Sequence, residues 1–155
     1  NLRFINSDLI YPLKESILNG NSFSVYSVSS NRRNIDTSIQ LKNILPKDSV
    51  VAVFFAGTLP YYLKDYYTVD LLGKSDKHIA SLKDQGKVRA HGMLTLPGHN
   101  KYDLNWSLKT YNPDWIQGAK WGKDNLLDNQ EFVDNYSYCA STQGYLKNKY
   151  MKKCN

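Results

Sequence analysis

The chain has 155 residues, 41% of them hydrophobic and 22% charged, with a formal net charge of +6. This length suits one domain with its own core, and this composition excludes a largely disordered chain. The charge favours anionic partners, but the sequence has no zinc-finger spacing, RNP motif or basic helix, so no nucleic-acid partner is expected. No hydrophobic run approaches the roughly 18–20 residues of a membrane span.

The first third of the chain predicts two helices with a strand between them. Residues 8–19 have Asp8 as an N-cap and apolar residues at helical spacing. Residues 23–28 alternate apolar and polar residues, as a strand does. The polar residues 31–36 are expected to form a break between regular elements. A second, short helix is expected over residues 36–45, because a proline disfavours helical backbone in the residue before it.

The middle of the chain predicts a sheet. Residues 48–57 (DSVVAVFFAG) contain a continuous apolar, β-branched-rich run, which is typical of a central strand covered on both faces. Residues 66–72 predict a second strand. Residues 75–82 predict a helical turn with Ser75 as the cap and Asp76 in the first turn, where the helix dipole favours an anion.

The last third predicts a helix over residues 103–111, a short buried strand over 114–117 and a hairpin over 136–151 around Gly144. Helices that alternate with buried strands indicate an α/β fold with a partly parallel, mixed sheet flanked by helices. The sequence has no linker or repeat, so we expect one domain over residues 1–155, with the motif-bearing core at 48–116.

Three polar segments that we expect to be turns lie at the ends of the predicted strands, where open α/β sheets bind their ligands. Residues 56–62 follow the first strand, residues 70–78 follow the second, and residues 96–103 precede a helix. Their convergence would form one dense polar cluster on a small domain. Its members would be Thr58, Tyr61, Tyr62, Asp70, Lys74, Asp76, His78, His99, Asn100, Lys101 and Asp103.

The sequence spacing of the candidate residues gives little support for a catalytic site or a metal site. His78, His91 and His99 lack the H-x-H or i, i+4 spacing of metal ligands, so no metal site is expected. Asp70, Asp76 and Asp103 have no pattern that fixes a glycosidase separation. The sequence also has no nucleophile elbow, P-loop or dinucleotide fingerprint. No cofactor is expected, and no residue is assigned a catalytic role.

A simpler interpretation of the same residues is structural. Asp76 and Asp103 would then cap helices, Lys74 would neutralise Asp70, and Gly73 would supply a positive φ in a turn. The two cysteines, Cys139 and Cys154, also allow two interpretations: a disulfide that staples a C-terminal hairpin in an oxidising compartment, or reduced thiols in the cytosol.

The order of several motifs resembles one known class of domain. The segments AGTLPYY, DLLGKSDKHIA, PGHNKYD and PDWI, within residues 48–116, resemble the soluble C-terminal domain of GT-C-type integral-membrane glycosyltransferases. These include arabinofuranosyltransferases and mannosyltransferase-like proteins that use polyprenyl-phosphate sugars. The matching residues are Gly57, Pro60, Tyr61, Asp70, Gly73, Asp76, His78, Gly98, His99, Lys101 and Asp103.

The resemblance implies an α/β domain on the periplasmic or extracellular face, excised from a longer membrane protein. Its partners would be the transmembrane half of the same polypeptide, the membrane surface and a glycan or polyprenyl-phosphate sugar. The catalytic carboxylate of that class lies in the membrane half, so the isolated chain is not expected to catalyse transfer. An oxidising location would favour the Cys139–Cys154 disulfide.

The sequence therefore predicts an accessory domain that helps bind or position the glycan acceptor or the lipid-phosphate sugar donor. Two alternatives remain open: a purely structural domain that docks onto the transmembrane half, and a free-standing carbohydrate-active or metal-binding protein.

Overall fold

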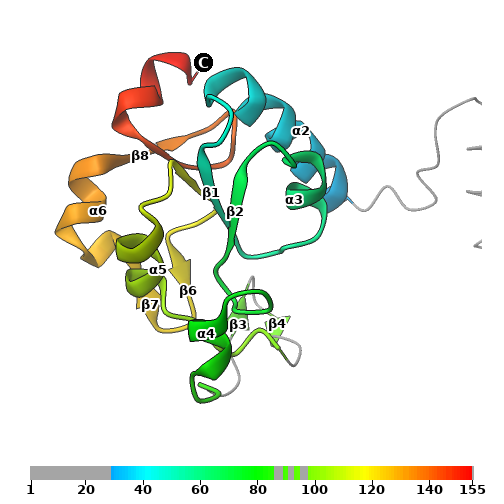
Figure 1. Ribbon diagram of the computed structural model, residues 1–155. Coiled ribbons are helices and arrows are strands. Elements are labelled where there is room, and N and C mark those ends of the chain that lie inside the picture. Colours follow the sequence, from blue (N-terminus) through cyan, green and yellow to red (C-terminus); the bar gives the residue numbers. More distant parts are fainter. Residues whose placement is uncertain (1–28, 86–88, 91–92, 95–97, 155) are drawn as a thin grey trace, which may run out of the picture. The chain divides into compact units, whose positions relative to one another are not determined.

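The computed structural model describes residues 29–85, 89–90, 93–94 and 98–154. The chain divides after Arg33, and Asn34–Asn155 forms one compact unit. In this unit helices cover both faces of a mixed five-stranded sheet (Figure 1), which confirms the expected α/β class. The helix expected over residues 8–19 and the strand expected over 23–28 lie outside the described residues.

The elements are short. The strands of the main sheet are β1 (Val50–Val53), β2 (Tyr67–Asp70), β5 (Trp115–Ile116), β8 (Tyr136–Cys139) and β9 (Gly144–Lys147). The two small hairpins pair β3 (Arg89–Ala90) with β4 (Met93–Leu94), and β6 (Lys120–Trp121) with β7 (Asp124–Asn125). The helices of the described residues are α2 (Ser29–Ile44), α3 (Thr58–Tyr62), α4 (Lys77–Ser81), α5 (Leu104–Tyr111), α6 (Gln130–Asn135) and the 3₁₀ helices η1 (Leu126–Asp128) and η2 (Asn148–Lys153).

The sheet has the strand order β2-β1-β5-β9-β8. Strand β1 is parallel to both β2 and β5, with Val51 opposite Thr68 on one side and Trp115 on the other. Strand β9 is antiparallel to β5 and β8. The chain leaves β1 for β2 and returns to β5 on the opposite side of β1. The carboxyl ends of β1 and β5 therefore form a topological switch point, where ligands bind in open α/β sheets.

Strand β1 divides the core into two layers because its side chains alternate between the two faces of the sheet. Val51 and Val53 belong to a buried cluster with residues of α2 and α3 such as Leu41 and Leu59. Ala52 belongs to a second cluster, which contains residues of α5 and α6. Figure 1 shows α2 and α3 on one side of β1 and β2, and α5 and α6 on the other. The expected central strand covered on both faces is confirmed.

Three local expectations were wrong. Residues 31–36 do not form a break between regular elements, because they lie inside α2, which begins at Ser29. The polar residues Arg32 and Arg33 are exposed there, while Leu41 and Ile44 in the same helix are buried. Tertiary packing of one face thus stabilises a helix that starts in a polar segment. The segment expected to be a turn after β1 contains the short helix α3, with Pro60 in its first turn, where proline is tolerated.

The third correction concerns the cap of α4. Asp76 and not Ser75 is the N-cap, and its side chain accepts a hydrogen bond from the Ile79 N–H. Within the described residues, α5 confirms the helix expected over residues 103–111, and β8 and β9 form the expected C-terminal hairpin. This hairpin ends at Lys147, because residues 148–153 form η2 and do not continue the strand.

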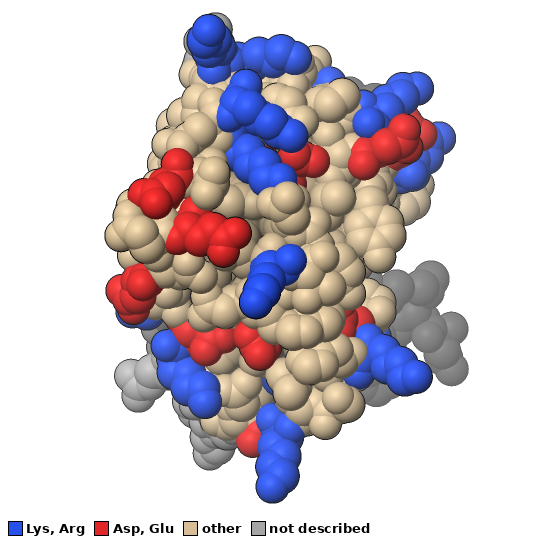
Figure 2. Space-filling model, turned by 60° about the vertical axis from the view of Figure 1, so that its left-hand side comes forward, with Lys and Arg blue, Asp and Glu red and all other residues tan. Residues whose placement is uncertain are grey.

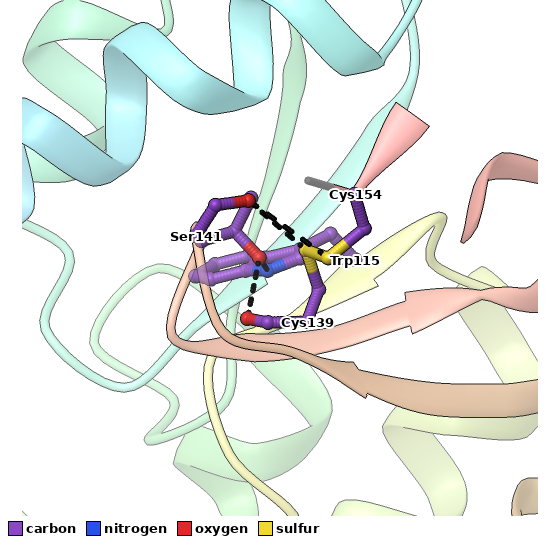
Figure 3. Close-up of a disulfide and its surroundings, with 5 residues drawn as sticks. Trp115, Cys139, Ser141 and Cys154 are labelled. Atoms are coloured by element: carbon purple, nitrogen blue, oxygen red, sulfur yellow. Dashed lines mark hydrogen bonds between the residues drawn. A yellow bond between two sulfur atoms is a disulfide. The ribbon is translucent and has the colours of Figure 1, made fainter. Parts of the chain in front are cut away.

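A disulfide between Cys139 and Cys154 joins β8 to the chain that follows η2. Figure 3 shows it against the buried indole ring of Trp115. The Trp115 Nε1 donates to Thr142 Oγ1 over 3.0 Å. A Cβ at Gly144 would lie 2.5 Å from the same indole, so the hairpin approaches Trp115 this closely only with glycine. The disulfide and the tryptophan together fix the C-terminal hairpin on the sheet.

Replacing both cysteines by serine should lower the free energy of unfolding by about 3 kcal/mol, because the bond closes a loop of about 15 residues and restricts the unfolded chain. Chemical denaturation of the oxidised chain and of the double-serine variant measures the difference. Reductant should destabilise the native chain and leave the double-serine variant unchanged. Equal stability of the oxidised chain and the variant would contradict this role of the disulfide.

Candidate functional site

Segments that follow β1 and β2 meet residues 98–101 near the carboxyl edge of the parallel strands. The Lys74 Nζ lies 2.9 Å from His99 Nε2. The ring of Phe55, which is 41% exposed, lies 6.1 Å from the His99 ring and 5.9 Å, edge-on, from Trp121. We name Phe55, Lys74, His99 and Trp121 the edge cluster. It combines an exposed aromatic ring, a cation and an imidazole.

The edge cluster stands on a rigid base at the switch point between β1 and β5. The Phe54 N–H donates to the Gln117 Oε1 over 2.8 Å, which joins the chain after β1 to the chain after β5. The Phe54 ring stacks on Trp121 with 4.7 Å between centroids. The Trp121 Nε1 donates to the main-chain carbonyl of His99 over 3.0 Å. The cluster is therefore held by main-chain and buried groups.

Lysine and histidine pair here in a way that sets the hydrogen-bonding role of each. An ammonium group has only donors, so the Lys74 Nζ donates and the His99 Nε2 accepts. The Lys74 ammonium is exposed and keeps further donors for an anionic or hydroxyl-bearing ligand.

Asp70 lies in the predicted site but has a structural role. It is 3% exposed, and its Oδ1 accepts from the Leu72 N–H over 3.0 Å. Its Oδ2 accepts from the Ser75 N–H over 2.8 Å. The carboxylate thus folds the chain after β2 around Gly73, whose φ is +71°. The partners of the Asp70 carboxylate are these backbone N–H groups, whereas Lys74 pairs with His99. The structure therefore does not support the hypothesis that Lys74 neutralises Asp70.

Asp76, Lys101 and Asp103 also serve backbone groups. Asp76 caps α4, and the Asp103 Oδ1 caps α5 by accepting from the Trp106 N–H over 2.8 Å. The Lys101 Nζ donates to the Ala80 carbonyl over 2.6 Å and so satisfies the carboxyl end of α4. The Asn100 carbonyl accepts from the Gln85 N–H. The structural interpretation of these motif residues is therefore supported by their contacts.

His78 belongs to a second group of rings. Its imidazole stacks on Trp106 with 4.0 Å between centroids, and Trp106 meets Tyr111 edge-on at 5.5 Å. Tyr111 in turn lies 6.2 Å from Tyr67, which is 58% exposed. The Tyr111 hydroxyl donates to the buried Asp76 over 2.6 Å. This hydrogen bond to a carboxylate, with some desolvation, raises the pKa of Tyr111 to about 12.

The remaining predicted residues lie on α3. Thr58 begins this helix, and Tyr61 and Tyr62 meet edge-on with 5.2 Å between ring centroids. Tyr61 is 78% exposed. Helix α3 packs through Leu59 into the core layer that includes α2, whereas Phe54 and Trp121 belong to the opposite layer. The tyrosine pair is thus separate from the base of the edge cluster.

Sequence reasoning missed two residues of the edge cluster. Phe55 was assigned to the interior of the strand, but β1 ends at Val53 and Phe55 is partly exposed. The run of two phenylalanines after the β-branched residues was the available signal. No local pattern indicated Trp121. It contacts His99, 22 residues earlier in the sequence, only because the fold brings the two residues together.

The described residues contain no group of three His, Cys, Asp or Glu side chains that could hold a metal ion, and His91 lies outside the described residues. Figure 2 shows basic and acidic side chains interspersed on one face of the molecule. Within the described part of the chain, none of the helices has the length and apolar content that a bilayer crossing requires.

Fold and site define a layered α/β domain with an aromatic and basic cluster at the carboxyl edge of its parallel strands. The chain belongs to the family of the domain of unknown function DUF8728, whose model matches residues 27–151. No curated protein and no solved structure matches the chain.

The turn at Gly73, next to Lys74, gives a direct test of how the chain after β2 is built. Gly73→Ala should destabilise the fold by roughly 1–3 kcal/mol, because a side chain at φ +71° is strained. The added Cβ would also lie 2.5 Å from Ile79 Cγ2. Gly57→Ala is the matched control, since nothing lies within 4 Å of its Cβ position, and should change stability little. Thermal denaturation compares them, and equal melting temperatures would contradict this role of Gly73.

The contact between Tyr111 and Asp76 predicts a pH effect. Because folding raises the pKa of Tyr111 from 10.0 to about 12, its contribution to stability is full below about pH 10 and disappears as pH rises through about 12. Asp76→Asn retains an acceptor for the cap but removes the charge, so the pKa of Tyr111 should fall toward 10. Asp76→Ala should in addition cost about 1 kcal/mol for the lost cap.

Carbon-detected NMR titration of the tyrosine rings measures that pKa in the native chain and in both variants. A Tyr111 pKa that stays near 12 in Asp76→Asn would show that the Asp76 charge is not its cause.

Proposed function

We propose that this chain is the extracytoplasmic accessory domain of a membrane-embedded glycosyltransferase. In this role the edge cluster binds the glycan acceptor or the lipid-phosphate sugar donor and presents it to the transmembrane half of the same polypeptide. The domain faces the periplasm or the cell exterior and lies near the membrane surface. The chemical step belongs to the membrane half, and the isolated chain does not catalyse transfer.

The observation that carries the proposal is the position of the edge cluster. Lys74 and His99 pair beside the exposed ring of Phe55, at the switch point of the parallel strands. An aromatic ring offers its apolar face to a sugar ring, and the Lys74 ammonium offers a point charge to a phosphate. The motifs in residues 48–116 that resemble glycosyltransferase accessory domains include both Gly73, beside Lys74, and His99.

The disulfide adds support for the location. Disulfides persist in oxidising compartments such as the periplasm and the cell exterior, and are rare in the cytosol. The bond between Cys139 and Cys154 lies in the core layer beside Trp115. A domain that depends on this bond fits the extracytoplasmic side of a membrane enzyme.

A second candidate function is a docking domain without its own ligand. The observation that favours it is the structural use of the motif carboxylates: Asp70, Asp76 and Asp103 all accept hydrogen bonds from main-chain N–H groups. In that case the motif preserves the shape of a surface that fits the transmembrane half.

Titration of the isotope-labelled chain with oligosaccharides and with a short polyprenyl-phosphate analogue tests the proposal by NMR. Amide shifts should occur at Phe55, Lys74 and His99. Lys74→Ala should weaken binding of the phosphate-bearing analogue about tenfold or more, because a hydrogen bond to a charged group contributes about 1.5–3 kcal/mol. Lys64→Ala, an exposed lysine just after α3, is the matched control and should leave binding unchanged.

His99→Ala separates the two candidates in the full-length protein. The contact of Trp121 uses the main-chain carbonyl of His99 and so survives the substitution. The accessory role predicts lower transferase activity with normal assembly. The docking role predicts loss of assembly, and no ligand shifts in the isolated chain. The second result would overturn the proposal.

A further inference from the structure

Gln117 follows β5 at the switch point between the parallel strands β1 and β5. Its Oε1 accepts from the Phe54 N–H over 2.8 Å, and its own main-chain N–H donates to the Ala52 carbonyl over 2.9 Å. The residue is half-buried. Contacts with the β1 chain therefore hold this side-chain amide in one orientation at the carboxyl edge of the sheet, where open α/β sheets bind ligands.

This orientation leaves one group of the Gln117 amide for a ligand. A main-chain N–H only donates, so the amide oxygen faces Phe54, and the Nε2 keeps both of its N–H groups for other acceptors. No described residue accepts a hydrogen bond from this Nε2. The buried side-chain atoms without a partner in the described part of the chain belong to Gln85 and Ser107, so the Gln117 Nε2 is accessible to solvent.

A series of contacts connects Gln117 with the edge cluster. Phe54, its hydrogen-bond partner, precedes Phe55, whose ring lies 6.1 Å from the His99 ring. The Lys74 Nζ lies 2.9 Å from the His99 Nε2. Gln117 and Lys74 are therefore the two ends of this series, and the exposed Phe55 ring stands between them in it.

The charges at this edge favour an anion. Residues 54–64 and 117–123, which follow β1 and β5, contain no aspartate or glutamate. Asp70, at the end of β2, is 3% exposed, and both of its carboxylate oxygens accept hydrogen bonds from main-chain N–H groups. The segments after β1 and β5 thus present no carboxylate that would repel an anion, and the Asp70 charge is buried.

The two polar groups at the ends of the series select the kind of ligand oxygen. The Lys74 ammonium and the Gln117 Nε2 donate hydrogen bonds and cannot accept them. An ionised phosphate oxygen only accepts and so satisfies such groups, whereas a sugar hydroxyl needs an acceptor for its own O–H. The apolar face of the Phe55 ring suits the organic part of a phosphate ester.

From these contacts we infer that Gln117 is a further ligand-binding residue of this edge: its Nε2 donates to an oxygen of a phosphate ester, Lys74 attracts the same anion, and Phe55 covers its organic part. The inference rests on the proposed function in taking the edge cluster as a ligand site. It deepens that proposal, because it selects a phosphate-bearing ligand over a neutral glycan and adds a binding residue from the chain after β5.

NMR titration of the isotope-labelled 155-residue chain compares phenyl phosphate, inorganic phosphate and D-glucose. Phenyl phosphate should bind with a Kd on the order of 1 mM, as a small weakly held ligand does, and should move the side-chain amide signals of Gln117. Inorganic phosphate should bind about threefold or more weakly, because it has no organic part for Phe55 to cover. Equal affinity for the two phosphates would overturn the choice of an ester, and D-glucose binding as tight as that of phenyl phosphate would overturn the choice of an anion.

Gln117→Glu separates the donor from the structural contact. The glutamate keeps an oxygen that accepts from the Phe54 N–H, so the fold should be retained, but a carboxylate replaces the donor. Binding of phenyl phosphate should weaken about tenfold or more, because a hydrogen bond to an ionised group is lost and a negative charge is added. Unchanged binding in this variant would overturn the inference.

Gln117→Met removes the donor without adding a charge, and it should weaken binding about fivefold. Full affinity in a folded Gln117→Met variant would assign the effect of Gln117→Glu to repulsion alone and would also overturn the inference. Gln40→Glu is the matched control, because it adds the same charge at a half-buried glutamine of α2. It should leave binding unchanged, and an equal loss there would contradict a local role of Gln117.

The same titration distinguishes failure of this inference from failure of the proposed function. The proposed function predicts shifts at Phe55, Lys74 and His99 in the native chain. If those shifts occur while the Gln117 side-chain signals stay in place and Gln117→Glu binds normally, only the assignment of Gln117 is refuted. If none of these signals moves with any ligand, both proposals are refuted.

Discussion

The parallel pairing of β1 with both β2 and β5 is the constraint on which the rest of the structure depends. A strand with apolar side chains on both faces is stable only when helices cover both sides, and here the α2 and α5 layers do so. Parallel pairing also brings the carboxyl ends of the three strands to one edge. The residues that follow those ends, among them Phe55, therefore share one surface with Lys74 and His99.

At that edge the motif residues fall into two groups with different physical roles. The carboxylates of Asp70, Asp76 and Asp103 accept hydrogen bonds from main-chain N–H groups and so fix the loops in one conformation. Lysine, imidazole and an aromatic ring remain at the surface of those loops. Such a division is what preorganised binding requires, since groups that are held by others lose little freedom when a ligand arrives. The same division is compatible with either role proposed for the motif set, ligand binding or docking.

Much of the fold could be predicted from local pattern. The apolar run of residues 50–56 indicated the buried strand, and Asp103 before an apolar helical repeat indicated the start of α5. Tertiary effects caused the errors. The polar residues 31–36 are helical because Leu41 and Ile44, further along the same helix, are buried. The contact of Trp121 with His99 and the position of Phe55 depend on the strand order, which local pattern does not contain.

Photo-crosslinking of the full-length protein with a diazirine-bearing lipid-phosphate sugar or glycan acceptor most directly tests whether the domain handles a glycosyltransferase ligand. Peptide mapping should place the label at the edge cluster, near Phe55, Lys74 and residues 98–101, and free ligand should compete it away. Label confined to the proposed transmembrane half, with none at this edge, would contradict the accessory role.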